Sequence, residues 1–201
     1  MLAAKDVARY FLGTFDAESG DNITNLKLQK LLYYAQGFHL AMQAGRPLFA
    51  DPLEAWEHGP VVRSVYHEYK GYGWRAIEPP DDFDPDDYLP EVREILDAVD
   101  RVYGPFTAKH LEWLTHMEPP WADTPRDQAI SPASIRDYFT SLVDEGRAGT
   151  APPYHPIWPS NGFRFQRRPS LAERLSPRRD RLRTITRRVA DTPDPWAGDD
   201  D

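Results

Sequence analysis

Apolar residues recur at helical spacing along most of this chain. A period of about 3.6 residues is seen from Lys5 to Phe15 and again after Thr24, Val62, Pro90, Thr107 and Pro132. The stretch between Thr24 and Gly45 is apolar on nearly every side, which is typical of a helix in the middle of a domain. The pattern therefore predicts a mainly α fold, a compact single-domain helical bundle with at most a short β-hairpin.

Several of these helices have clear boundary signals. Thr24 is placed to cap the long helix, and Gly45 supplies the left-handed residue that ends it. Pro60 fixes its own φ angle and restricts Gly59, so the next helix is expected to begin at this Gly-Pro step. Residues 78–90, EPPDDFDPDDYLP, form an acidic, proline-rich segment that is expected to bury little and to be a mobile surface loop.

Signals for extended structure are weaker. Leu53, Ala55 and Trp56 are candidates for a short extended piece. Residues 157–165 contain Asn161-Gly162, a strong hairpin signal that Pro159 weakens.

The composition changes at residue 146. The main domain is expected to span residues 1–145, and a Pro-rich linker with an Arg-rich helical C-terminal extension is expected over residues 146–201. Residues 161–190 hold ten arginines and two acidic residues, a local charge of +8. Since the whole chain carries −8 and residues 191–201 hold five aspartates, residues 1–160 carry −11. This basic arm is expected either to dock on its own acidic domain or to contact a separate partner.

Composition also limits the chemistry. The chain has no cysteine, which excludes disulfides and zinc-thiolate sites, and no run of about 18 apolar residues. We therefore expect a cytoplasmic protein with no membrane partner. Motifs for phosphate loops, dinucleotide folds, serine hydrolases and zinc proteases are missing from the sequence, so no cofactor is expected.

Three histidines can be interpreted either as structural residues or as residues with a chemical role. His39 is expected to be a hydrogen-bonded core residue. His58 next to Glu57 is either a charge-coupled pair or a helix terminator, and His116 with Glu118 is either an acid/base pair or part of a helix stop before two prolines. The structural alternative is favoured in each case, so we expect no catalytic residue, no metal site and no enzyme activity.

Binding features are better represented. Lys27, Lys30 and Tyr34 share one side of the long helix, either as a polar edge of the core or as a contact patch. Trp56 is expected in the core and Trp74 at the surface, where large aromatics anchor partners. The candidate partner-binding residues are Lys27, Lys30, Tyr34, Trp56, Glu57, His58, Gly59, Pro60, Arg63, Tyr66 and Trp74.

Four segments together resemble one known family. KLQKLLYYAQGFHLA, GRPLF, EAWEHGPVVRSVYHEYKGYG and LTHMEPPW, in this order, are similar to the Panacea domain of SocA-like and GepA-like phage-associated antitoxins. The similarity extends from about Val7 to Phe139. It implies a mainly helical, non-enzymatic domain that neutralises a toxin, usually encoded beside it, by direct binding. The basic arm lies outside the resemblance.

Alternative functions remain open at this stage. The chain is expected to act as an antitoxin that covers its cognate toxin. An adaptor that delivers a bound toxin to a protease has the same sequence features, and the arginine-rich arm also suits a nucleic-acid-binding regulator. The acidic body and the acidic C-terminus argue against nucleic acid.

Overall fold

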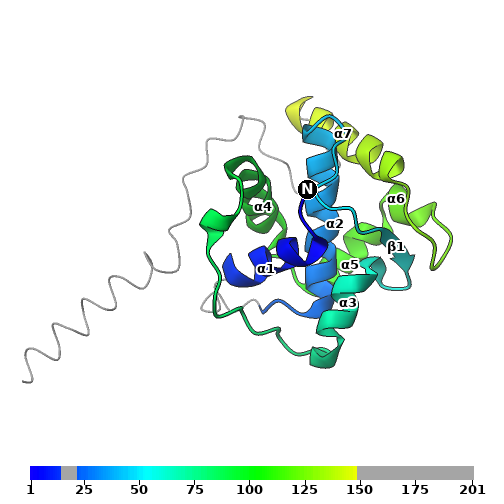
Figure 1. The fold of residues 1–201 in the computed structure, drawn as a ribbon. Coiled ribbons are helices and arrows are strands. Elements are labelled where there is room, and N and C mark those ends of the chain that lie inside the picture. The colour runs from blue at the N-terminus through cyan, green and yellow to red at the C-terminus, as the bar shows by residue number, and fades with distance from the viewer. Residues whose placement is uncertain (15–21, 149–201) are drawn as a thin grey trace, which may run out of the picture. The chain divides into compact units, whose positions relative to one another are not determined.

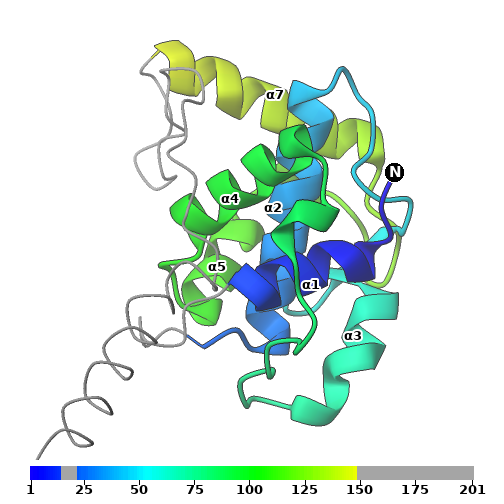
Figure 2. The same cartoon turned by 60° about the vertical axis from the view of Figure 1, so that its left-hand side comes forward.

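The structure is a computed structural model that describes residues 1–14 and 22–148. The chain divides into two units, Met1–Phe165 and Gln166–Asp201, and all described residues lie in the first. Within this unit, helices surround a central helix, α2, as Figures 1 and 2 show. The predicted mainly α fold with a short β-hairpin is confirmed.

The helices are α1 (Ala4–Thr14), α2 (Asn25–Met42), α3 (Arg63–Tyr69), α4 (Pro90–Tyr103), α5 (Ala108–His116), α6 (Pro119–Ala122) and α7 (Pro132–Ala148). Two 3-10 turns, η2 (Lys70–Tyr72) and η3 (Pro85–Asp87), follow α3 and precede α4. The strands are β1 (Leu53–Trp56) and β2 (Gly59–Val62).

Helix α2 is the core of the domain because nearly all of its side chains are buried. It packs against α1, α3, α4, α5, α7 and β2. Tyr34 stacks on Tyr103 of α4 with ring centroids 3.8 Å apart, and Phe139 of α7 lies against Gly37, where a larger residue would collide with its ring. Burial on all sides explains why the apolar pattern of this segment has no single face.

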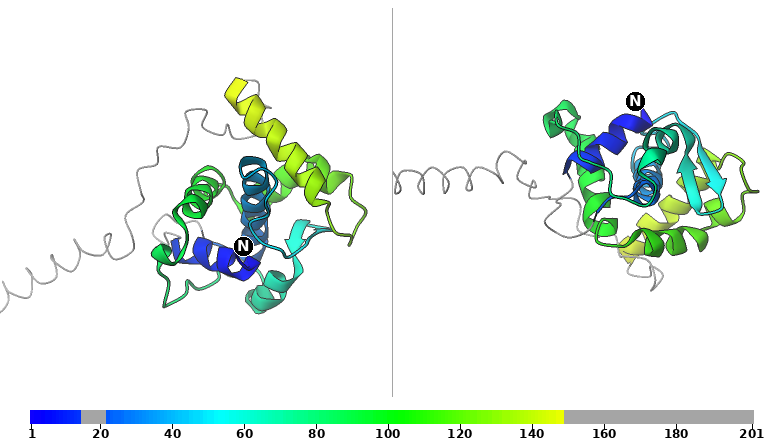
Figure 3. Two further views of the ribbon diagram at one scale, coloured as in Figure 1. Left: turned by 45° about the horizontal axis from the view of Figure 1, so that its top comes forward. Right: turned by 90° about the horizontal axis from the view of Figure 1, so that it is seen from below.

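The hairpin has no free edge. β1 pairs antiparallel with β2 in the register Leu53↔Val62. On its other side β1 bonds the segment 127–130, through Ala55 N to Gln128 O and Ile130 N to Leu53 O. β2 lies against α2 (Figure 3). At this contact Val62 N donates to Gln29 Oε1.

The expected helix start at the Gly59-Pro60 step is therefore wrong. Both residues belong to strand β2, and α3 begins only at Arg63. Gly59 has a φ of 99°, which a glycine reaches without steric cost and which is incompatible with a helix. The bond from Val62 to Gln29 and the β-branched Val61 and Val62 extend the strand instead.

The acidic segment 78–90 buries more than its composition suggests. Tyr88 is buried, and its hydroxyl donates to the Asp6 carbonyl of α1 over 2.8 Å. Phe83 packs edge-on against Tyr10, with ring centroids 5.7 Å apart. Two aromatic rings thus attach the segment to α1, which single-residue composition does not reveal.

The predicted cap at the start of α2 is confirmed, because Thr24 Oγ1 accepts from Lys27 N. Thr107 Oγ1 caps α5 in the same way by accepting from His110 N. After α2 the chain is left-handed at two residues, Ala44 with a φ of 51° and the predicted Gly45 with a φ of 81°. The predicted hairpin at 157–165 and the basic arm lie outside the described residues. Among residues 1–14 and 22–148, no helix is long and apolar enough to cross a bilayer.

Candidate protein-binding site

The polar side of α2 lies inside the domain. Lys27, Lys30 and Tyr34 are 2%, 0% and 0% exposed, so a partner that docks on this conformation does not touch their side chains. The contact-patch interpretation of these three residues is therefore not supported, and they form a polar edge of the core.

Lys30 attaches the hairpin to α2. Its ammonium nitrogen donates to the carbonyl oxygen of Pro60 over 3.0 Å. Burial lowers the pKa of Lys30 to about 7, and the nearby carboxylates of Glu112 and Glu118 oppose this shift without cancelling it. The Lys30 side chain occupies the space beside Gly59, where a Cβ atom would approach Nζ to 2.6 Å and Thr115 Oγ1 to 2.7 Å.

Tyr34 is hydrogen-bonded to the buried carboxylate of Glu118. Its hydroxyl donates to Glu118 Oε1 over 3.0 Å, and Glu118 is fully buried between α5 and α6. Burial, with the charge of Glu118 adding to it, raises the pKa of Tyr34 well above its usual value. The phenol therefore keeps its proton and remains a donor to the carboxylate.

His58 has a different partner from the one that the sequence suggests. Its Nδ1 lies 2.8 Å from Glu112 Oε1 of α5, while Glu57 lines the groove described below. Lys109 Nζ lies 2.7 Å from the other oxygen of Glu112, and these two partners lower the pKa of that carboxyl against the effect of burial. Both interpretations of His58 are therefore wrong: it does not pair with Glu57, and it lies in the hairpin turn between β1 and β2 instead of ending a helix. Its bond to Glu112 joins this turn to α5.

His116 and His39 have structural roles. α5 ends at His116, whose ring stacks on Trp121 with centroids 4.0 Å apart, and burial lowers its pKa. The proposed acid/base pairing with Glu118 is not formed, because Glu118 is directed to Tyr34. The Nδ1 atom of His39 lies 2.8 Å from the Arg46 carbonyl oxygen, so the expected hydrogen bond is present. The residue is only half-buried, so its predicted core position is wrong.

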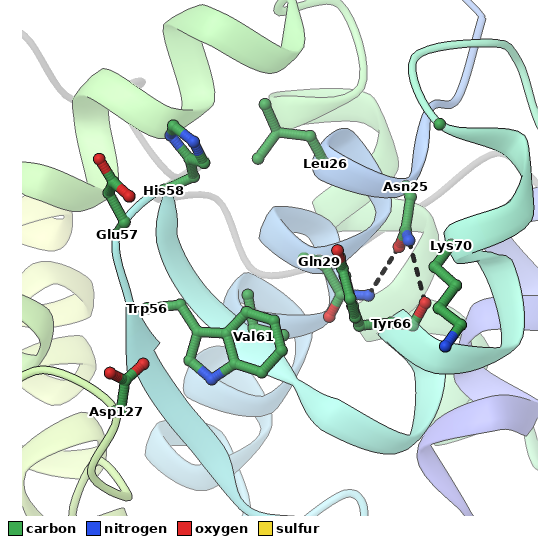
Figure 4. Close-up of a pocket in the computed structure, with 11 residues that line it drawn as sticks. Asn25, Leu26, Gln29, Trp56, Glu57, His58, Val61, Tyr66, Lys70 and Asp127 are labelled. Atoms are coloured by element: carbon green, nitrogen blue, oxygen red, sulfur yellow. Dashed lines mark hydrogen bonds between the residues drawn. The ribbon is translucent and has the colours of Figure 1, made fainter.

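A groove of roughly 430 Å³ opens between the hairpin, the start of α2 and the end of α3 (Figure 4). Its lining consists of Asn25, Leu26, Gln29, Trp56, Glu57, His58, Val61, Tyr66, Lys70, Gly73 and Asp127. This volume is in the range of sites that take a small molecule or a few side chains of a protein.

Two aromatic rings form the middle of the groove. Trp56 and Tyr66 meet edge to face with centroids 4.9 Å apart. Arg63 lies over the Trp56 ring at 5.4 Å from its centroid and donates through two nitrogens to Glu54, which also accepts from Trp56 Nε1. Asn25 and Gln29 beneath them are bonded to each other and to the backbone of Tyr66 and Val62. The groove is thus preformed.

The structure brings together part of the predicted site. Trp56, Glu57, His58 and Tyr66 line the groove, and Arg63 stacks beside it. Trp56 is only partly buried, so its predicted core position is wrong. Trp74, one residue after the groove residue Gly73, is 88% exposed, as predicted.

Sequence reasoning missed most of the groove lining. Seven lining residues were not candidates: Asn25, Leu26, Gln29, Val61, Lys70, Gly73 and Asp127. Asp127 is brought there only by the pairing of 127–130 with β1. Gly59 and Pro60 are buried beneath the groove as backbone supports. Over residues 1–14 and 22–148, no three histidine or acidic side chains converge as a metal site would require.

Comparisons with known proteins agree with the resemblance seen in the sequence. Residues 28–122, just under half of the chain, match the family model described as Antitoxin SocA-like, Panacea domain, so the resemblance seen in the sequence is confirmed. A 55-residue segment is 49% identical to Antitoxin SocA of Caulobacter vibrioides (strain NA1000 / CB15N) and covers 27% of this chain. The match spans 29% of that relative's length. No solved structure matches the chain.

Proposed function

We propose, from the match of residues 28–122 to the SocA-like Panacea family, that this chain is an antitoxin that neutralises a cognate toxin by direct binding. The toxin would be the product of an adjacent gene, and no bond would be made or broken in the encounter. The observation that carries the proposal is the preformed groove of Trp56 and Tyr66 next to the exposed Trp74. Tryptophan and tyrosine are enriched among the few residues that carry most of the binding energy of protein interfaces.

The closed edges of the hairpin favour recognition through side chains. β1 is paired with 127–130 and β2 lies against α2, so a partner cannot add a strand to this sheet. The groove therefore offers rings and charged groups rather than backbone donors. This suits a folded partner that inserts anchoring side chains.

The buried ionisable groups support binding over catalysis. Lys30 and Glu118 have the environments that often mark catalytic residues, yet both are fully buried and bonded to Pro60 and Tyr34. Substrates do not reach them in this conformation. Lys30 instead holds the hairpin against α2, and Glu118 is bonded to Tyr34 of the same helix. A preformed binding surface needs such support.

The test is co-expression with the product of the adjacent gene. We expect growth to be restored by this chain and the two proteins to co-purify. A Trp56→Ala/Tyr66→Ala variant, folded by circular dichroism, should lose both effects, whereas Leu89→Ala, an exposed apolar residue at the start of α4, should retain them. Restored growth without any association would contradict neutralisation by binding.

The same cells separate the alternatives. Direct blocking leaves the half-life of the toxin unchanged or longer when this chain is present, whereas delivery to a protease shortens it. Protection that requires the arginine-rich arm and weakens steeply with salt in a DNA-binding titration would instead indicate a nucleic-acid regulator.

A further inference from the structure

Two carboxylates of the groove form no close ion pair among the described residues, although the charge of Arg63 acts on Asp127 at longer range. Glu57 and Asp127 lie on the strand side of Trp56, as Figure 4 shows, and neither forms an ion pair within residues 22–148. Elsewhere on this surface acids beside arginines are paired, for example Glu54 with Arg63 at 2.7 Å. Two exposed carboxylates beside an aromatic ring are a suitable environment for a cation.

The neighbouring arginines are already engaged. Arg63 donates two hydrogen bonds to Glu54. Arg126 donates to the Trp56 carbonyl oxygen over 2.8 Å and lies over the Trp121 ring at 4.6 Å. Lys70 lies on the opposite side of the groove, beyond Tyr66 (Figure 4).

Contacts of the main chain fix the positions of both acidic residues. Asp127 N donates to the Ala55 carbonyl oxygen over 2.9 Å, which ties the residue to strand β1. Glu57 belongs to the two-residue hairpin turn, whose other residue, His58, is bonded to Glu112. A cation that enters the groove therefore meets two acidic residues whose main-chain positions are already fixed.

We propose that the groove receives an arginine side chain of the bound protein, with its guanidinium beside Trp56 and its N–H groups donating to Glu57 and Asp127. This inference rests on the proposed function and specifies the chemistry of its partner. A planar guanidinium stacks on an aromatic ring and presents five N–H donors in a fixed fork, whereas an ammonium is a compact point charge with three donors. Arg63 already makes this combination with Trp56 and Glu54 inside the protein. The charge of −11 on residues 1–160 adds long-range attraction for a basic partner surface.

The experiment is an NMR titration of the full-length chain carrying ¹⁵N in its tryptophan indoles. The probes are the blocked tripeptides acetyl-Gly-Arg-Gly-amide, its citrulline analogue, which is a neutral isostere, and its glutamate analogue. A Trp56→Phe variant assigns the Trp56 signal. We expect the arginine peptide to shift this signal saturably and to bind about three- to tenfold more tightly than the citrulline peptide, the size of an exposed charged contact beside an aromatic ring.

Charge-removing variants complete the test. Glu57→Gln/Asp127→Asn should bring the affinity for the arginine peptide down to that for citrulline, while Asp81→Asn/Glu91→Gln, which removes two exposed acids elsewhere, should leave it unchanged. Equal binding of the citrulline peptide, tighter binding of the glutamate peptide or no saturable shift at Trp56 would overturn the inference. If the chain does not bind the arginine peptide as expected but still protects cells and co-purifies with its toxin, the proposed function stands and only the arginine inference is overturned.

Discussion

The ammonium of Lys30 lies 3.0 Å from the carbonyl oxygen of Pro60 and joins the central helix to the strand that borders the groove. The lysine reaches that oxygen because Gly59 has no Cβ; a methyl group there would come within 2.6 Å of Nζ. The missing side chain of Gly59 thus leaves the space through which Lys30 reaches Pro60. This accounts for the positive φ of Gly59 better than a helix start does.

Gly59→Ala is expected to destabilise the domain. A φ of 99° is strained for any L side chain, and the new methyl group would also collide with Lys30 and Thr115. Together these effects should lower the free energy of unfolding by about 2–4 kcal/mol, measured by urea denaturation. Gly71→Ala is the matched control, because nothing lies within 4 Å of its Cβ position, and it should change stability by less than about 0.5 kcal/mol. Equal effects of the two substitutions would contradict this account of Gly59.

Lys30 predicts a particular pH dependence of stability. Its pKa falls from 10.5 to about 7 on folding, so between these values the unfolded chain binds this proton and the folded chain does not. Raising the pH over this range therefore favours the folded state. Relative to Lys30→Met, which lacks the titrating group, the wild-type unfolding free energy should rise by about 2 kcal/mol from pH 7 to pH 9. Denaturant titrations at both pH values measure this, and a constant difference would show that Lys30 stays charged.

Tyr34 and Glu118 should be energetically coupled. Tyr34→Phe keeps the stacking on Tyr103 but removes the donor to a fully buried carboxylate, which should cost about 1–3 kcal/mol. In the Glu118→Gln background the same substitution should cost clearly less, because no buried charge is left without that donor. Tyr69→Phe is the control, since its hydroxyl has no hydrogen bond among the described residues, and it should be nearly neutral. If the effects of Tyr34→Phe and Glu118→Gln on the unfolding free energy are additive, the two side chains are not coupled.

The fold was largely predictable because its signals are local. Thr24, Thr107 and Gly45 act at helix ends through contacts within a few residues, and the all-round apolar pattern of α2 identified the central helix. The second strand of the hairpin, Gly59–Val62, was missed because distant groups hold both strands in place. Gln29 bonds β2 and residues 127–130 bond β1, and neither relation has a local sequence signal.

The site was only partly predictable for the same reason. Trp56, Glu57 and His58 form a compact motif, so sequence reasoning found them, but it paired His58 with its neighbour instead of Glu112, which is 54 residues away. Lys27 and Lys30 were candidates for a surface because lysine is rarely buried. The nearby carboxylates and the Pro60 carbonyl oxygen, which make the burial of Lys30 tolerable, are visible only in three dimensions.

Substitution of Trp74 is expected to weaken toxin binding without changing the stability of the fold. At 88% exposed it contributes little to the core, so Trp74→Ala should change the unfolding free energy by less than about 0.5 kcal/mol. As an anchor of the proposed interface it should weaken toxin binding by about 2 kcal/mol, roughly thirtyfold in Kd, measured by calorimetry with the purified toxin. Leu89→Ala also removes an exposed apolar side chain, 64% exposed, and should leave Kd unchanged because it lies at the start of α4, outside the residues that line the groove. An unchanged Kd for Trp74→Ala would move the interface away from this end of the groove, whereas a loss for both variants would show that the contact surface extends to α4.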